Sequence, residues 1–287
     1  MRICAIDCGS NSFHLLIADI EKKDQFEIIA DDKSLLYLGA EVASTGEISA
    51  ASLLRAKRVI RHYKTLISRH NVEIVKCVAT SAIRSAKNGD QVIESLTKTL
   101  GHEVKVISGV LEAEIIFRGI SAVSSLPESR VLNIDMGGGS LELMAGQRYG
   151  LEYAASEPLG ASRLARELKV SDPLTKKDIE KIEKKCDKYF KEFKDNFKSS
   201  AFFNFFVSSG TLNTLVSMAR SKTDGYVPAA NSNVSVTSKE MMNICEDIIT
   251  SNKEERQQML GYDANRNEFI QTAAVTAKKI AALAQNN

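Results

Sequence analysis

Two short segments of the sequence carry the same arrangement of residues that could do chemistry. The first reads Ile6-Asp7-Cys8-Gly9-Ser10-Asn11-Ser12-Phe13, and the second reads Ile134-Asp135-Met136-Gly137-Gly138-Gly139-Ser140-Leu141. In each segment an apolar run ends at an aspartate, a glycine follows one residue later, and two small residues and a serine lead into another apolar run. The repetition predicts two related half-structures rather than a short solenoid repeat.

This pattern suits the binding of a phosphate group. Small residues let the backbone come close to phosphate oxygens, so that several N–H groups point at one anion, and the hydroxyl groups add further donors. An aspartate at the end of each strand suits Mg²⁺, which prefers a few carboxylates together with phosphates. We therefore predict Asp7 and Asp135 as magnesium ligands. The predicted phosphate-binding residues of the two loops are Gly9, Ser10, Asn11, Ser12, Gly137, Gly138, Gly139 and Ser140. Ordinary hairpin turns, which also favour Asp, Gly, Asn and Ser, are the alternative for either loop.

The elements around the loops alternate between strand and helix patterns. Apolar segments rich in Val and Ile predict strands at residues 2–6, 13–20, 72–78, 103–107, 130–134, 141–145, 151–155 and 202–207. Capping residues and helical spacing predict helices at residues 49–70, 90–101, 111–123, 175–197, 237–249 and 268–284. Mixed strands and helices with apolar central strands indicate an α/β fold.

Composition narrows the functional class. The 287 residues suffice for one large or two ordinary domains, and 44% hydrophobic with 26% charged residues is typical of a globular protein. No apolar run approaches the roughly 20 residues of a membrane span, and Asp7 interrupts any signal-peptide core, so we expect a cytoplasmic protein with no membrane partner. The net charge of +2 argues against nucleic acid as a partner. The five scattered cysteines are expected to be reduced, and neither they nor the four histidines form a recognisable metal site.

Five motifs in order give the sequence a family resemblance. They are residues 5–14, Val78-Ala79-Thr80-Ser81-Ala82-Ile83-Arg84, Ile107-Ser108-Gly109 with Glu112-Ala113, residues 135–142, and Ser208-Ser209-Gly210-Thr211. Together they resemble the exopolyphosphatase / guanosine pentaphosphate phosphohydrolase (Ppx/GppA) family of the actin-like ATPase superfamily. The resemblance implies two ribonuclease-H-like domains facing a central cleft. It places residues 1–118 with a returning C-terminal helix, about 272–287, in the first domain, and residues 119–271 in the second.

The resemblance also implies roles for single residues. Glu112 matches a general base that would polarise the attacking water, and Glu142 matches a second glutamate that would position water or metal. Arg84 would clamp a phosphate through bidentate hydrogen bonds. Ser209, Gly210 and Thr211, at a predicted helix start, would donate to phosphate or cap the helix. For Glu112 and Arg84 the alternatives are a solvated helix face and a surface arginine. Further candidates along the substrate path are Lys87, Arg163, Arg166 and, more loosely, Arg266.

Four positions depart from the usual family pattern. Leu111 stands where many members have an acidic residue, Leu141 replaces a common threonine, and Glu114 and Tyr37 stand where arginines are frequent. The loss of two expected cations weakens the expectation that a highly charged guanosine pentaphosphate binds tightly. Longer relatives also carry an extra helical C-terminal region, to which nothing in this sequence corresponds. Both features predict a preference for short polyphosphate chains.

The sequence therefore predicts a Mg²⁺-dependent phosphohydrolase that releases terminal phosphate from inorganic polyphosphate, with guanosine pentaphosphate (pppGpp) as a further candidate substrate. Two alternatives stay open: a small-molecule kinase of the same superfamily, and a non-catalytic sensor of a guanosine polyphosphate. The apolar final helix is compatible with a homodimer and equally with a buried bridge between domains. No feature supports a covalent mechanism.

Overall fold

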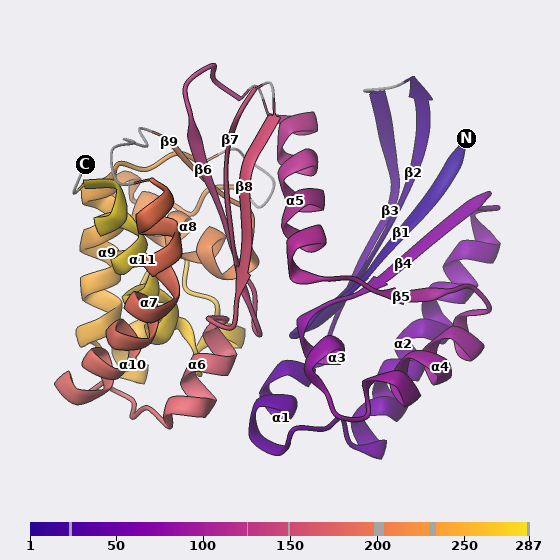
Figure 1. Cartoon of the computed structure of the whole chain (residues 1–287), viewed down its shortest axis with the longest axis horizontal. Coiled ribbons are helices and arrows are strands. Elements are labelled where there is room, and N and C mark those ends of the chain that lie inside the picture. The colour runs from indigo at the N-terminus through magenta and orange to yellow at the C-terminus, as the bar shows by residue number, and fades with distance from the viewer. Residues whose placement is uncertain (23–24, 125, 149, 198–203, 230–233, 286–287) are drawn as a thin grey trace. The chain divides into compact units, whose positions relative to one another are not determined.

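The chain forms two compact units, Met1–Glu112 and Ala113–Asn287. The computed structural model in Figure 1 describes residues 1–22, 25–124, 126–148, 150–197, 204–229 and 234–285. Each unit is built on its own β-sheet. Among the described residues, no helix combines the length and apolar character needed to cross a membrane.

The first unit contains a five-stranded sheet in the order β3-β2-β1-β4-β5. β1 runs antiparallel to β2 and parallel to β4, β2 runs antiparallel to β3, and β4 runs parallel to β5. Its elements are β1 (Arg2–Cys8), β2 (Ser12–Lys22), β3 (Gln25–Leu35), α1 (Leu38–Thr45), α2 (Ala50–Arg69), β4 (Ile74–Ala79), α3 (Ser81–Ser85), α4 (Gly89–Leu100), β5 (Val104–Val106) and the start of α5 (Gly109–Val123).

One face of this first sheet is covered by α2 and α4. Alternate β1 residues, Cys4, Ile6 and Cys8, are buried against these helices, whereas Ala5 and Asp7 on the opposite face are exposed. α2 starts where the sequence predicts, because the Ser49 side chain accepts a hydrogen bond from the Ser52 amide at 3.2 Å. The resulting sheet carries the end of β1, and with it Asp7 and the first glycine loop.

The second unit repeats this topology with a four-stranded sheet in the order β8-β7-β6-β9. Again the first strand is antiparallel to the second, the second to the third, and the first is parallel to the fourth. Its elements are β6 (Val131–Met136), β7 (Leu141–Gln147), β8 (Gly150–Glu157), α6 (Ala161–Leu168), α7 (Lys176–Asn196), β9 (Asn204–Val207), α8 (Gly210–Asp224), α9 (Ser238–Thr250), α10 (Lys253–Gln257), η1 (Ala264–Arg266) and α11 (Ile270–Gln285). The half-structures predicted from the repeated loops are therefore present.

The two faces of the second sheet are covered differently. Alternate β6 residues Leu132, Ile134 and Met136 face the large core formed with α6, α7, α8, α9 and α11. Val131, on the other face, packs with Phe117 of α5 in a smaller apolar cluster. Figure 1 shows α5 running beside this sheet. One helix thus covers the face that carries Asp135.

The final helix differs from its expected place. α11 packs against α9, α7, α6 and α8 and belongs to the second unit, and the division falls after Glu112 rather than after residue 118. The physical reason is that small and apolar residues of α11, including Ile270, Ala273 and Ile280, are buried in the core of the second unit. The expectation that this helix belongs to the first domain is therefore corrected. The apolar surface of the helix, on which the homodimer expectation rested, packs in the core of the second unit.

Most predicted elements are confirmed, with boundaries shifted by a few residues. The predicted strand at 202–207 is observed as β9, Asn204–Val207, and its first two residues lie outside the described residues. Residues 286–287 of the predicted C-terminal helix also lie outside them.

Candidate active site

The first glycine loop connects β1 to β2 and is fixed by backbone hydrogen bonds. The Gly9 amide donates to the Ser12 carbonyl at 3.0 Å. The Ser10 carbonyl accepts from the Gly39 amide at 2.8 Å, and the Asn11 carbonyl accepts from the Leu36 amide at 2.8 Å. Because these bonds fix the loop carbonyls, the peptide planes of the loop are held in one orientation, which an anion-binding loop requires.

The buried hydroxyl of Ser10 supports a ligand at this loop. Ser10 is only 7% exposed, and its Oγ has no hydrogen-bond partner among the residues that the structure describes. A buried hydroxyl without a partner costs free energy, and a bound phosphate oxygen would satisfy it.

The second glycine loop connects β6 to β7 and has the same frame. The Gly137 amide donates to the Ser140 carbonyl at 3.0 Å, as Gly9 does to Ser12. The Gly137 carbonyl accepts from the Ala161 amide at 3.0 Å, so the start of α6 holds the loop from behind. The Thr272 hydroxyl of α11 in turn donates to the Ala161 carbonyl at 2.9 Å. The two loops predicted from the sequence therefore share both a residue pattern and a hydrogen-bond pattern.

A glycine behind each loop was missed by the sequence reasoning. A Cβ atom on Gly160 would lie 2.4 Å from backbone atoms of Gly139 and Ser140, and a Cβ atom on Gly39 would lie 2.8 Å from the Ser10 Cβ. Both glycines belong to a repeated tripeptide that follows the third strand of its unit, Leu38-Gly39-Ala40 and Leu159-Gly160-Ala161. This second repeat was the available signal.

A row of four polar side chains crosses the second sheet beside its loop. Asp135 on β6 lies opposite Glu142 on β7, and Glu142 lies opposite Ser156 on β8. The Ser208 hydroxyl, directly after β9, donates to Asp135 Oδ2 at 2.6 Å. The Ser156 hydroxyl donates to Glu142 Oε1 at 2.7 Å. Two neighbouring carboxylates are thus each held by a serine, and we call these four residues the carboxylate row.

Burial affects both acids of the carboxylate row. Glu142 is 1% exposed and Asp135 is half-buried. Burial raises the pKa of Asp135 above its usual value, and the Ser208 hydrogen bond acts in the opposite direction. A cation at this position would stabilise the charged form of the aspartate.

The donor set fits Mg²⁺. Among the described residues, no three His, Cys, Asp or Glu side chains gather closely enough to hold a metal ion by themselves. Mg²⁺ characteristically uses one or two carboxylates and fills its other positions with water and substrate phosphates. The Asp135–Glu142 pair is a set of this kind. In the first unit the corresponding pair is Asp7, which is exposed, and His14.

The predicted general base and the predicted phosphate clamp form one ion pair in the first unit. Arg84 Nη1 lies 3.0 Å from Glu112 Oε2 and donates to the Ile107 carbonyl at 2.9 Å. The Glu112 side chain is 16% exposed, so the alternative of a solvated helix face is wrong. Within the described part of the chain both bonds of this guanidinium run through Nη1, which leaves Nη2 and Nε to donate to an oxyanion.

The start of α8 carries the third predicted phosphate segment. Ser209 caps the helix, since its Oγ accepts from the Leu212 amide at 3.0 Å, and Ser208 belongs to the carboxylate row instead. Arg266 Nη1 donates to the Thr211 hydroxyl at 3.2 Å. A Cβ atom on Gly210 would lie 2.5 Å from Arg266 Nη2, so the guanidinium lies directly against the first turn. A helix N-terminus and a guanidinium together favour an anion. Arg266, only loosely predicted, is thus placed with this segment.

The remaining basic candidates have other contacts. Arg166 forms an ion pair with Glu268, and Arg163 lies 3.7 Å from Glu167. The Lys87 side chain lies alongside Gly46, and its backbone amide donates to the Gly46 carbonyl. Arg163 lies at the second glycine loop, because its backbone amide donates to the Gly138 carbonyl at 2.9 Å, whereas these contacts of Arg166 and Lys87 involve neither loop.

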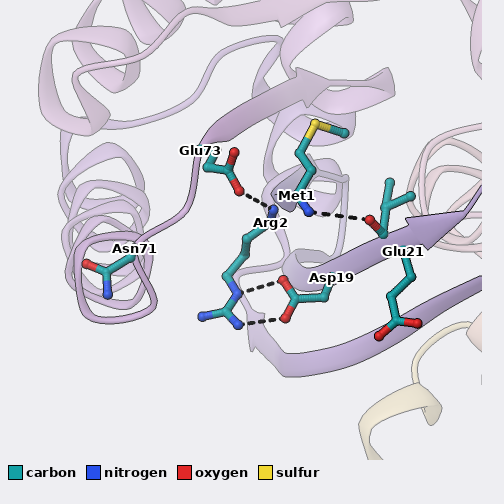
Figure 2. A pocket seen from close by; sticks show the side chains of 7 residues that line it. Met1, Arg2, Asp19, Glu21, Asn71 and Glu73 are labelled. Carbon is teal, nitrogen blue, oxygen red and sulfur yellow. Dashed lines mark hydrogen bonds and ion pairs between the residues drawn. The ribbon is translucent and has the colours of Figure 1, made fainter.

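A surface cleft of about 430 Å³ lies at the other end of β1, away from the loop (Figure 2). There Arg2 forms an ion pair with Asp19 at 2.6 Å, and its backbone amide donates to Glu73 Oε1 at 2.7 Å. The lining residues are Met1, Arg2, Asp19, Ile20, Glu21, Asn71 and Glu73. The lining is acidic and contains none of the predicted site residues, so this cleft does not suit a phosphate.

The topology and the paired loops define the class of protein. Two mixed α/β units, each opening with three antiparallel strands and continuing with parallel ones, form the ribonuclease-H-like, actin-like ATPase architecture. Two solved structures share it. An exopolyphosphatase from Cytophaga hutchinsonii matches with a TM-score of 0.90 and 27% identity, over 99% of this chain and 91% of that one. The Aquifex aeolicus member of the Ppx/GppA family matches with a TM-score of 0.82 and 26% identity, over 100% and 92%.

Sequence comparison identifies the family. The model of the Ppx/GppA phosphatase family matches residues 16–286. Exopolyphosphatase 2 of Mycobacterium tuberculosis is 26% identical over 288 residues, which cover 98% of this chain and 90% of that protein. Exopolyphosphatase 1 of Mycobacterium leprae is 32% identical over 173 residues, 60% of this chain and 51% of that protein. The chain belongs to the Ppx/GppA phosphatase family.

Proposed function

We propose that this protein is a Mg²⁺-dependent exopolyphosphatase that releases terminal phosphate from inorganic polyphosphate in the cytoplasm. Its family and the exopolyphosphatases that it resembles support hydrolysis of a phosphoanhydride bond. The observation that carries the proposal is the Arg84–Glu112 pair, in which a carboxylate is held by one guanidinium nitrogen while others stay available to an oxyanion.

In this proposal Glu112 acts on water. Arg84 binds Oε2 of this side chain, and the carboxylate accepts a hydrogen bond from the attacking water. The water oxygen forms a bond to the terminal phosphorus, its proton passes to Glu112, and the bond from phosphorus to the bridging oxygen breaks. Arg84 Nη2 and Nε neutralise charge on the transferred group. Phosphoryl transfer needs mainly positioning and charge stabilisation, which these two side chains supply.

The glycine loops and the carboxylate row supply binding. Backbone N–H groups of residues 10–12 and 138–140 and the Ser10 hydroxyl donate to phosphate oxygens. Asp135 and Glu142 of the second unit would hold Mg²⁺, which when bound supplies positive charge that neutralises phosphate oxygens. Asp7 is the carboxylate at the corresponding strand end of the first unit. The start of α8 and Arg266 take a further phosphate. Ser209 contributes by fixing the helix start rather than by donating directly.

Short substrates are the favoured ones. In many family members a highly charged ligand would meet acidic or basic partners at the positions of Leu111, Glu114 and Tyr37. Two of the expected cations are missing from this chain. Tripolyphosphate requires fewer compensating charges than a long polymer or pppGpp. We therefore place short polyphosphate first and pppGpp second.

Phosphate release measured across a panel of tripolyphosphate, long polyphosphate, pppGpp and ATP tests the proposal. We expect Mg²⁺-dependent release, fastest per enzyme from tripolyphosphate and abolished by a chelator. ATP consumption that requires an added acceptor would instead establish a kinase. Tight calorimetric binding of a guanosine polyphosphate without turnover would establish a sensor.

A further inference from the structure

A buried asparagine lies in the middle of β6, next to the carboxylate row. Asn133 is 0% exposed, and neither its Oδ1 nor its Nδ2 has a hydrogen-bond partner among the residues that the structure describes. A buried amide without partners is destabilising, so a group that the protein residues do not supply is expected to satisfy it.

The position of Asn133 on the sheet indicates where that group lies. Side chains alternate along a strand, so Asn133 shares a face with Val131 and Asp135, two residues away on either side. Its cross-strand neighbours are Met144 on β7 and Phe206 on β9. On three sides the amide therefore meets apolar side chains.

The apolar side is closed by a helix. Val131 and Met144 belong to a buried cluster with Ala113 and Phe117 of α5, and Phe206 packs against the same cluster. None of these side chains can accept or donate a conventional hydrogen bond. The direction left for a polar partner leads along β6 to Asp135.

The spacing along the strand fits one water molecule. The Cα atoms of residues two apart on a strand are separated by about 6.6 Å. Two polar atoms that share one bridging water are separated by about 5.6 Å. A bridging water either accepts a hydrogen bond from Asn133 Nδ2 or donates one to Asn133 Oδ1. The same water donates a hydrogen bond to the Asp135 carboxylate. A buried water of this kind, with two to four polar partners, is a regular part of protein structure.

We propose that Asn133 is a positioning residue whose amide holds a water molecule against the Asp135 carboxylate. Ser208 fixes Oδ2 of that carboxylate from the β9 side, and the water fixes the carboxylate from its own strand. Asp135 is then held from two directions, as a carboxylate must be to present one geometry to a magnesium ion. The effect on catalysis rests on the proposed function, whereas the water site itself does not.

Two substitutions whose side chains are isosteric with each other separate the effect of the hydrogen bond from the effect of packing. Asn133→Val fills the site with a side chain that suits a strand but cannot hold water, and Asn133→Thr has the same shape with one hydroxyl. Crystal structures of wild type and both variants show whether the water is present. We expect water between residue 133 and Asp135 in wild type and in Asn133→Thr, and none in Asn133→Val.

Thermal unfolding and kinetics complete the test. We expect Asn133→Val to melt at the same temperature as wild type or higher, because it removes a buried polar group. We expect its kcat for tripolyphosphate to fall about 10–100-fold, typical of lost outer-shell support at a metal site, with an unchanged KM and a raised Mg²⁺ requirement. Asn133→Thr recovers most of this loss.

The outcomes separate the two claims. Wild-type density in which Asn133 contacts protein groups directly, with no water beside Asp135, overturns the inference. Equal kcat and equal Mg²⁺ requirement in the Val and Thr variants also overturn the positioning role. A wild-type protein that shows the water but releases no phosphate from any compound of the panel refutes the proposed function and leaves the water site standing.

Discussion

The glycine loops of the two units share a frame and differ in what surrounds them. In both, a backbone amide closes the loop at 3.0 Å, and a Leu-Gly-Ala segment supports it from behind. Opposite the loop aspartate, however, the first unit has His14 and the second unit has Glu142. The predicted base and its arginine occur in the first unit, and the carboxylate row in the second.

The contacts of the two loop aspartates also differ. The residue that follows the fourth strand of the second unit, Ser208, binds Asp135 through its side chain, whereas Thr80 in the first unit bonds to the Cys8 carbonyl through its backbone amide. Asp7 is exposed, whereas burial raises the pKa of Asp135. Under the proposed function, the second unit would hold the cation and the first would activate water.

The largest effect is expected at the base in the first unit. Glu112→Gln preserves the hydrogen bond from Arg84 but removes the proton acceptor, so we expect kcat for tripolyphosphate to fall about 10²–10⁴-fold. Melting temperature and substrate binding by calorimetry should stay at wild-type values. Glu94→Gln, the same change at an exposed site on α4, is the control and should keep full activity. Unchanged phosphate release in Glu112→Gln would remove the first unit from the chemical step.

The next effect compares the two supporting glycines. In Gly160→Ala the new Cβ meets backbone atoms at 2.4 Å, which cannot move without distorting the second loop. In Gly39→Ala it meets the Ser10 Cβ at 2.8 Å, which is a smaller overlap. We expect Gly160→Ala to lose most activity and about 1–3 kcal/mol of unfolding free energy, and Gly39→Ala to lose less of both.

Denaturant unfolding and phosphate release, measured on both variants, decide this comparison. A larger loss in Gly39→Ala than in Gly160→Ala would show that the first loop tolerates less displacement, and would reverse the ranking drawn from the contacts.

The smallest effect provides a baseline for glycine substitutions. Gly119 lies inside α5, and a Cβ atom there would have nothing within 4 Å. Gly119→Ala should therefore raise the free energy of unfolding by about 0.5–1 kcal/mol and leave phosphate release unchanged. A destabilised Gly119→Ala protein would mean that losses at Gly39 and Gly160 cannot be assigned to loop contacts alone.

The sequence predicts those parts of this molecule that depend on local pattern. Strand and helix positions follow from apolar spacing and caps such as Ser49, and the two loops follow from their repeated residues. Partnerships between distant residues do not, because no local pattern encodes which side chain a fold brings opposite another. One example is the hydrogen bond from Ser208 to Asp135. Another is the pair of hydrogen bonds that Arg84 Nη1 donates to Glu112 and to the Ile107 carbonyl.

The place of the final helix shows a second limit. An Ala-rich helix carries little directional information, since small residues pack against many surfaces, and only the assembled core selects its neighbours. The asparagine at position 133 shows a third, because the amino-acid pattern alone gives no reason to expect an amide at a fully buried strand position.

The hydrogen bond from Thr272 to the Ala161 carbonyl has a consequence for biosynthesis. The start of α6 supports the second glycine loop, and α11 supports the start of α6, so a loop encoded near the middle of the chain is completed by a residue near its end. The first loop, by contrast, draws its support from Leu36 and Gly39 and can form while translation continues. A chain on the ribosome can therefore support its first loop early, whereas the support that Thr272 gives to the start of α6 forms only after this residue has emerged.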